Sequence, residues 1–203
     1  MNQQELKYFL DEKVLQYNTL DFIDSDPVQI PHRYSTKEDI EISGFLAATI
    51  AWGNRKMIIN NANKMMDLMG NSPFDFIMNS SEDDLTRFDG FVHRTFNSDD
   101  LKFFIKSLRN IYQNHHGLEH VFHQYQADDS MQEAISQFKK IFFEVDHLPR
   151  TTKHVSDPLN NSAAKRINMW LRWMIRKDQQ GVDLGIWNTI SPSKLSSTLD
   201  VHS

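Results

Sequence analysis

Two residues in the C-terminal part of the chain have side chains suited to covalent chemistry, Lys165 and Asp200. Lys165 begins a predicted helix rich in basic and aromatic residues, KRINMWLRWMIR. A lysine amine that loses its proton in such surroundings can attack an electrophilic carbon. Asp200, in the segment Leu-Asp-Val-His, is suited to stabilise the positive charge that forms. The alternative interpretation is that Lys165 is a solvated surface charge, as most lysines are.

The composition narrows the class of protein. The 203 residues are 39% hydrophobic, which is enough for one substantial core. The absence of cysteine excludes disulfides, thiolate catalysis and cysteine-bound metals, and it fits a reducing compartment. The sequence has no apolar run long enough to span a membrane and no signal-peptide pattern at its start. We therefore expect a cytoplasmic protein.

Charge is distributed unevenly along the chain. Residues 1–138 hold 12 Lys and Arg against 21 Asp and Glu, whereas residues 139–177 hold 9 against 3. The basic block also contains Trp170 and Trp173, and a block of this kind can neutralise the phosphates of a nucleic acid. The alternative is that its charges pair with those of the acidic part.

Almost every segment is predicted to be helical, because apolar residues recur at spacings of three and four. The helix after Ser35 is apolar on most sides, which indicates a central buried helix, and Ser35 with Glu38 has the pattern of a capping box. Asn54 is a predicted N-cap for the next helix, and Ser98 precedes another. Ser130 with Glu133 suggests a further capping box. In total, about nine helices are expected.

These elements predict one mainly α domain over residues 1–203. Its acidic helical lobe covers residues 1–145, and a loop over residues 146–161 leads to the basic helix and candidate catalytic segment, residues 162–203. The loop contains two prolines and should connect the two parts without a long helix of its own.

Four motifs occur in order along the chain: His32-Arg33-Tyr34, GFLAATIAWGNR over residues 44–55, the helix from Lys165 to Arg176, and Leu-Asp-Val-His around Asp200. Together they resemble an uncharacterised bacterial family that is common in Bacteroides relatives. That family is itself distantly similar to the helix-hairpin-helix DNA glycosylases, and most to the archaeal 8-oxoguanine glycosylase branch. The resemblance implies a helix-hairpin-helix glycosylase-like fold with two helical lobes around a cleft.

The resemblance also implies roles for particular residues in a base-excision DNA glycosylase and lyase. Lys165 corresponds to the nucleophile that forms a Schiff base with the sugar, and Asp200 to the catalytic aspartate. Residues near the extruded base would be Trp52, Asn54, Arg55, His32 and Arg33. DNA would bind through residues 139–177, with phosphate contacts from Arg166, Arg172, Arg176 and Lys177. Lysine chemistry of this kind needs neither a metal nor a cofactor, so we expect none.

The chain departs from the glycosylase pattern in two ways. The segment before Lys165, residues 157–162, contains no glycine, so a glycine-rich hairpin that cradles phosphate is not expected there. The chain ends three residues after Asp200, where the family continues for several helices, so the sequence looks C-terminally truncated.

Two other functions fit parts of the sequence. The motif His116-x-x-Glu119-His120, with His123 nearby, matches a zinc-hydrolase pattern, although Gly117 is a poor helix residue at its centre. Alternatively, the helix that begins at Lys165 supplies only charge and stacking surface to a non-enzymatic module that binds nucleic acid or protein.

Overall fold

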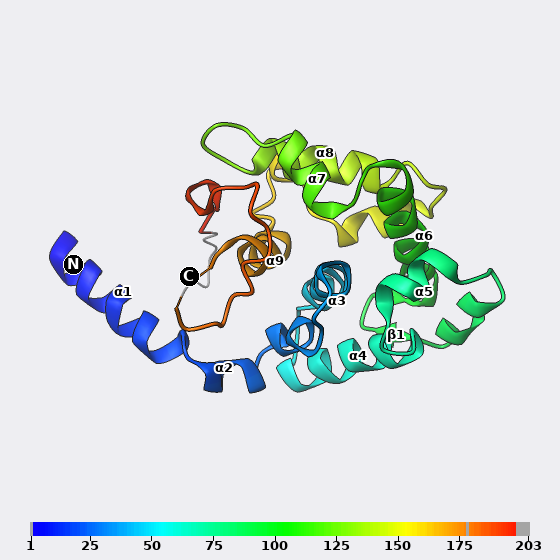
Figure 1. The fold of residues 1–203 in the computed structure, drawn as a ribbon, viewed down its shortest axis with the longest axis horizontal. Coiled ribbons are helices and arrows are strands. Elements are labelled where there is room, and N and C mark those ends of the chain that lie inside the picture. Colours follow the sequence, from blue (N-terminus) through cyan, green and yellow to red (C-terminus); the bar gives the residue numbers. More distant parts are fainter. Residues whose placement is uncertain (1, 178, 198–203) are drawn as a thin grey trace.

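The computed structural model describes residues 2–177 and 179–197, and this part of the chain is mainly α-helical (Figure 1). Its α-helices are α1 (Gln3–Tyr17), α2 (Leu20–Asp24), α3 (Lys37–Thr49), α4 (Arg55–Leu68), α5 (Pro73–Asn79), α6 (Ser98–Asn114), α7 (Leu118–Gln124), α8 (Gln132–Phe142) and α9 (Lys165–Ile175). The mainly α prediction is confirmed. Asp200 lies outside the described residues.

Short elements connect the helices. Strands β1 (Val92–His93) and β2 (Phe96–Asn97) form an antiparallel hairpin. The 3₁₀ turns are η1 (Pro27–Gln29), η2 (Pro31–Arg33), η3 (Asp84–Phe88), η4 (Pro149–His154), η5 (Pro158–Asn160) and η6 (Pro192–Lys194). Two of them, η4 and η5, give local structure to the predicted loop over residues 146–161. Within the described part, every helix is too short or too polar to cross a lipid bilayer.

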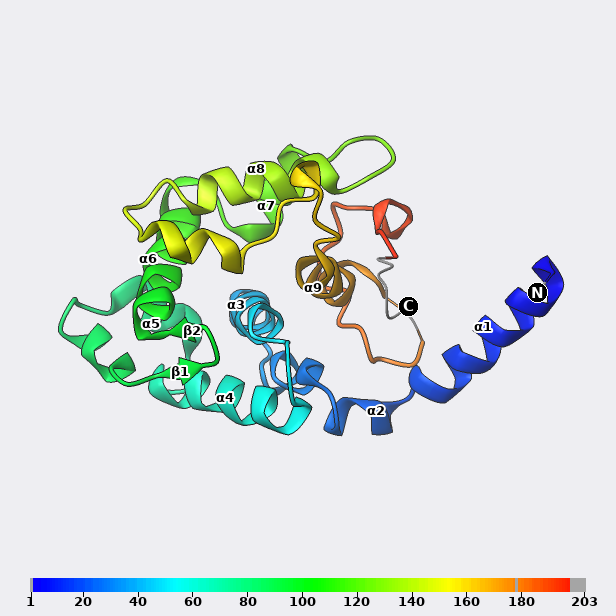
Figure 2. The same cartoon turned by 180° about the vertical axis from the view of Figure 1, so that it is seen from behind.

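Helix α3 lies at the centre of the molecule, with α4, α5 and α9 packed around it (Figures 1 and 2). Its residues from Ile40 to Thr49 are all buried, as expected for the predicted central helix. Gly44 allows α9 to pack closely, because a Cβ atom at this position would lie 3.2 Å from Cδ1 of Trp170. Around this contact a set of rings packs mainly edge to face: Phe45, Phe104, Phe122, Phe138, Phe142, Trp170 and Trp187.

The starts of α3 and α4 test two predicted caps. Oδ1 of Asn54 accepts a hydrogen bond of 3.2 Å from the backbone N of Met57, so the predicted cap of α4 is confirmed. The capping box at Ser35 is wrong. The N-cap of α3 is Thr36, whose hydroxyl donates to Asp39 instead of accepting from the helix backbone.

The starts of α6 and α8 also differ from the sequence pattern. The cap of α6 is Asn97, which forms a capping box with Asp100, and Ser98 is already the first helical residue. The capping box predicted at Ser130 is wrong, because Met131 occupies the N-cap position of α8 without a side-chain cap. Met131 is fully buried, so core packing decides where this helix begins.

Glu41 on α3 is a buried carboxylate that joins distant segments. The hydroxyl of Tyr112 donates to its Oε2 at 2.7 Å, and Nε1 of Trp187 donates to its Oε1 at 2.5 Å. Nζ of Lys37 lies 3.4 Å from Glu41 and 2.7 Å from Glu119. Burial raises the pKa of Glu41, although the hydrogen bond from Tyr112 and the charge of Lys37 oppose this rise.

The segment after α9 is held by similar contacts. The carboxylate of Glu119 accepts the backbone N and the hydroxyl of Thr189. The backbone N of Leu184 donates to the carbonyl of Trp173, and that of Trp187 to the carbonyl of Met174. These bonds satisfy carbonyls that the end of α9 would otherwise leave without a partner.

We predict that Glu41→Ala lowers the free energy of unfolding by about 2–4 kcal/mol, because the donors of Tyr112 and Trp187 would remain buried without an acceptor. Glu41→Gln should cost much less, since an amide oxygen can still accept from Trp187. The raised pKa of Glu41 also makes the wild type more stable relative to Glu41→Gln at low pH.

The stability advantage of the wild type over Glu41→Gln should be complete below the ordinary pKa of glutamate. It should decline as pH rises through the raised pKa of Glu41. Urea denaturation of both proteins from about pH 4 to about pH 8 measures it. A stability difference that grows with pH would contradict the prediction.

Candidate functional site

A pocket of 520 Å³ lies at the N-terminal end of α9 and is here named the α9 pocket. It is lined by Ala51, Trp52, Ser156, Ser162, Ala163, Ala164, Lys165, Arg166 and Met169. Its volume is within the range of about 300–1,000 Å³ that is usual for small-molecule sites. The pocket thus brings together Trp52, Lys165 and Arg166, three of the residues selected from the sequence.

Trp52 follows the end of α3, and its indole contacts the side chains of His93, His154 and Arg166. The ring of His93 in β1 meets it edge-on at 5.0 Å, and the ring of His154 is stacked on it at 6.0 Å. Nε2 of His93 donates to the carbonyl of Trp52, while its Nδ1 accepts from Asn61. Burial lowers the pKa of His93, which favours the neutral ring that this bonding pattern requires.

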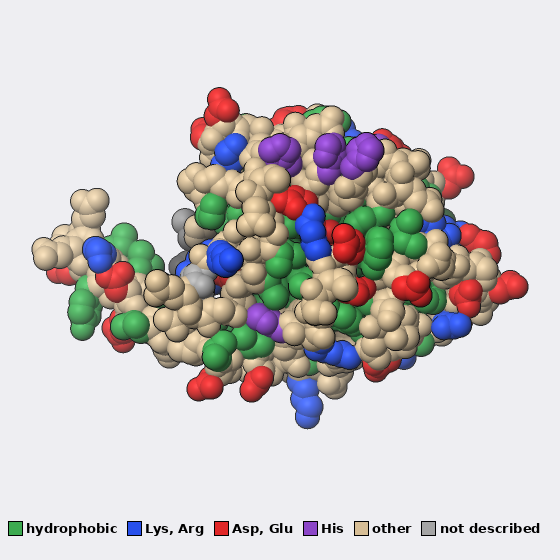
Figure 3. All heavy atoms as spheres, in the orientation of Figure 1, with side chains coloured by type: hydrophobic (Ala, Val, Ile, Leu, Met, Phe, Trp, Pro, Cys, Tyr) green, Lys and Arg blue, Asp and Glu red, His purple; other side chains and the backbone are tan. Residues whose placement is uncertain are grey.

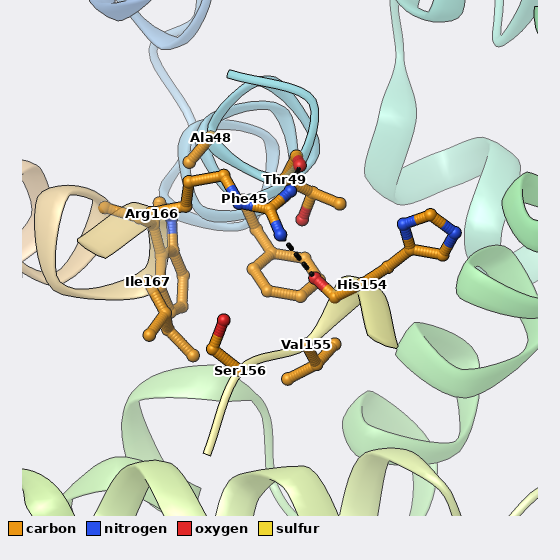
Figure 4. A pocket seen from close by; sticks show the side chains of 9 residues that line it. Phe45, Ala48, Thr49, His154, Val155, Ser156, Arg166 and Ile167 are labelled. Carbon is orange, nitrogen blue, oxygen red and sulfur yellow. Dashed lines mark hydrogen bonds between the residues drawn. The ribbon is translucent and has the colours of Figure 1, made fainter. Parts of the chain in front are cut away.

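Arg166 is directed into the protein, toward the end of α3 and the backbone of His154 (Figure 4). Its guanidinium donates to the carbonyl of Thr49 and, at 3.4 Å, to the carbonyl of His154. The guanidinium carbon also lies 4.6 Å from the centre of the Trp52 ring. Burial lowers the pKa of Arg166, but a guanidinium stays protonated at neutral pH. Arg166, which the sequence assigned to phosphate contacts, thus makes its hydrogen bonds within the protein.

Behind Trp52, Asp100 and His154 form a buried pair. Asp100 is fully buried and accepts hydrogen bonds from Arg150 and from the hydroxyl of Thr151 at 2.7 Å. Nε2 of His154 lies 3.3 Å from Oδ2 of Asp100, outside hydrogen-bond geometry. Burial lowers the pKa of His154 despite the nearby carboxylate. His154 is therefore a neutral ring that packs between Asp100 and the wall of the α9 pocket.

The loop that leads into α9 adopts an unusual backbone. Asn161 and Ala164 both have positive φ, 59° and 46°, and such a conformation is costly for alanine. Ala164 is the N-cap of α9, and its side chain offers no acceptor to the first amides of the helix. Lys165, the first residue of the helix, is half-buried where these amides begin. The positive end of the helix dipole therefore lies beside the pocket.

The other residues predicted near the base do not line the α9 pocket. Asn54 caps α4, and Arg55 is exposed, 3.9 Å from Asp26. Nε2 of His32 donates to the carbonyl of Val182 at 2.9 Å. Arg33 donates to the side chains of two asparagines, Asn63 and Asn71.

The remaining predicted phosphate contacts lie further along α9. Arg172 and Arg176 both donate to the buried carboxylate of Asp183, at 3.0 and 2.5 Å. Their side chains line a different groove, beside α1. Lys177 is exposed just after the helix. Arg172 and Arg176 recur on the helical face that carries Lys165, so the basic stripe of α9 continues from the pocket into this groove.

The metal-site alternative receives no support from the described residues. His116 and Gly117 both have positive φ and separate α6 from α7, so the motif does not lie on one continuous helix. Glu119 is buried and points toward Lys37, while the histidines lie on the surface near α7 (Figure 3). No group of three His, Asp or Glu residues in the described part is arranged to hold a metal ion.

Sequence reasoning missed His93, Asp100 and His154, which surround or support Trp52. None of the three belongs to a short motif, and they come from β1, α6 and η4. Only the capping pattern of Asn97 with Asp100 gave a local reason to single out one of them.

We predict that Arg166→Ala lowers the free energy of unfolding by about 2–3 kcal/mol, because it removes a charged donor from two buried carbonyls. Chemical denaturation measures the change. Arg87→Ala is the matched control, since the Arg87 side chain is half exposed on η3, and it should leave the denaturation midpoint unchanged. Equal denaturation midpoints for Arg166→Ala and Arg87→Ala would show that the hydrogen bonds from Arg166 to the two carbonyls do not stabilise the fold.

Comparison with known proteins identifies a family but no individual relative. No curated protein and no solved structure gives a significant match to the chain. A family model matches residues 26–203, which leaves α1 and α2 outside the matched region. The similarity to helix-hairpin-helix glycosylases stays a prediction. The match shows that the chain belongs to the family described as "Protein of unknown function (DUF2400)".

Proposed function

We propose that this protein is a cytoplasmic base-excision DNA glycosylase with lyase activity, which acts on a damaged base through a Schiff base at Lys165. The observation that carries the proposal is the α9 pocket, where the candidate nucleophile and the aromatic ring of Trp52 line one cavity. The two residues are far apart in the sequence. That both line one cavity of 520 Å³ favours a shared role in binding a substrate over the alternative that Lys165 is a solvated surface charge.

The proposed reaction begins with extrusion of the target nucleotide, because its sugar carbon C1′ is inaccessible inside a duplex. The nitrogen lone pair of Lys165 forms a bond to C1′ while the bond from C1′ to the base breaks. The base leaves with that electron pair and takes up a proton. The bond from C1′ to O4′ then breaks, the nitrogen passes a proton to O4′, and an open-chain imine results. Loss of a C2′ proton forms a double bond between C2′ and C3′ while the bond from C3′ to oxygen breaks and the 3′ phosphate leaves.

The surroundings of the pocket suit this substrate. The indole of Trp52 provides an apolar wall beside the base, and its position is held by His93 and Arg166. The start of α9, where the N-cap Ala164 has no capping side chain, directs the positive end of the helix dipole toward a phosphodiester next to the sugar. Asp200 stays the proposed carboxylate that stabilises the cationic sugar, and this assignment rests on the sequence motif alone.

A non-enzymatic module that binds nucleic acid is the alternative, because the basic face of α9 serves binding equally well. The two functions differ in their need for the lysine amine. A binder loses only one charge when Lys165 becomes Gln, whereas the enzyme loses its nucleophile.

We predict that wild-type protein forms a covalent adduct with DNA when borohydride reduces the imine, and that Lys165→Gln forms none. The substrates are duplex oligonucleotides that carry an abasic site, uracil or 8-oxoguanine. Adducts are measured as bands of reduced mobility on a denaturing gel. Lys165→Gln should keep the melting temperature of the wild type, because Lys165 lines a cavity and is not part of the packed core.

Lys153→Gln is the matched control, as Lys153 is an exposed lysine of η4 outside the pocket, and it should give the full adduct yield. An adduct of undiminished yield with Lys165→Gln would remove Lys165 from the role. Failure of the wild type on all three substrates, with DNA binding intact, would favour the binding module.

A further inference from the structure

A second groove, of 410 Å³, lies between the N-terminal helices and the C-terminal half of α9 and is here named the α1 groove. The described residues that line it are Lys13, Val14, Tyr17, Asn18, Phe22, Arg172 and Arg176. Helix α1 extends away from the body as an arm, and none of its residues is buried (Figures 1 and 3). One wall of the groove therefore comes from helices outside the matched family region, and the other wall comes from α9.

The charges around the α1 groove are predominantly basic. Lys13, Arg172 and Arg176 line it, and Arg55 reaches its edge, 6.0 Å from the ring centre of Phe22. The opposing carboxylate of Asp183 is buried beneath the two arginines and orients both of them.

Asp26 is a further carboxylate near the groove, 3.9 Å from Arg55. Burial raises its pKa, while the charges of Arg55 and Arg172 lower it. The described residues that line the groove include three basic side chains and no Asp or Glu, although the chain as a whole carries a net charge of −5.

Two aromatic rings stand among these charges. Tyr17 is 52% exposed, and Phe22 is half-buried. Their ring centres are 6.3 Å apart and the planes are inclined by 75°, which is an edge-to-face contact, and Arg55 lies over the ring of Phe22. The exposed ring of Tyr17 in a basic groove resembles the usual arrangement for binding unpaired bases, which stack on aromatic rings while the backbone follows the charges.

The α1 groove is aligned with the α9 pocket. Arg172 and Arg176 follow Lys165 by seven and eleven residues, and both lie within about 20° of it around the helix axis. They are about 10 and about 16 Å further along that axis. This distance leaves room for a short stretch of strand that continues beyond a sugar held at Lys165.

We propose that the α1 groove binds a single-stranded stretch of DNA that flanks the nucleotide held in the α9 pocket. The position of the flanking strand rests on the proposed function, while binding in the groove is a property of its own residues. The protein would then act on lesions next to unpaired DNA, and α1 with α2 would supply part of the substrate site.

The experiment measures binding of a fluorescent oligodeoxythymidine to the full chain by anisotropy over a range of salt concentrations. Lys13→Gln should reduce the slope of log affinity against log salt by about 0.7, the value for one phosphate contact on a single strand. Lys7→Gln is the matched control on the same helix, because Lys7 pairs with Asp11 outside the groove, and it should leave the slope unchanged. Tyr17→Ala should weaken binding at least about fivefold.

Equal slopes for Lys13→Gln and Lys7→Gln, no effect of Tyr17→Ala, or tighter binding of a blunt duplex or of the matching RNA would each overturn the proposal. The outcome is separable from the proposed function. Normal trapping at Lys165 with unaffected groove variants would reject the groove alone. The expected groove binding without any trapping would reject the glycosylase and leave a site for single-stranded DNA.

Discussion

The burial of one carboxylate, that of Glu41, is the constraint on which the rest of the structure depends. An ionised carboxylate in an apolar core is unfavourable unless donors surround it. Here the donors come from Lys37 on α3 itself, from Tyr112 and from Trp187, so two other segments must converge on α3. The backbone carbonyl of the same residue accepts from Trp170, which sets the position of α9 against α3. That position brings the start of α9 next to the residues that follow α3.

Helix α9 uses its two faces for different purposes. Its apolar side, with Trp170, Trp173 and Met174, completes the core. Its other side carries the basic residues, but these do not act alike. Arg166 turns inward to backbone carbonyls, whereas Arg172 is held by a buried carboxylate and stays half exposed. The number of basic residues in a segment therefore overstates the number of charges that can meet a phosphate, because some of them satisfy the protein itself.

The α9 pocket combines a tightly held wall with a strained entrance. Trp52 is fixed by neutral histidines and by the guanidinium of Arg166, so its ring has little freedom to turn. The loop at Ala164 adopts a left-handed conformation and leaves the start of α9 without a side-chain cap. Such strain persists only where surrounding contacts enforce it, and here Asn168 binds the carbonyl of Ala164. A rigid wall beside the N-terminus of a helix suits a binding site.

The sequence by itself determined the helical class, the central position of α3 and the cap at Asn54, because these depend on local spacing and on burial along one helix. It also identified Lys165 and Trp52 as residues worth attention. Only the tertiary structure decided that these two line one pocket, that Arg166 faces inward and that the His116 motif is interrupted. The capping boxes predicted at Ser35 and Ser130 are wrong because contacts between distant segments set where these helices begin. Periodicity reports which side of a helix is buried, whereas the partner of a polar side chain is set by packing between segments that are distant in the chain.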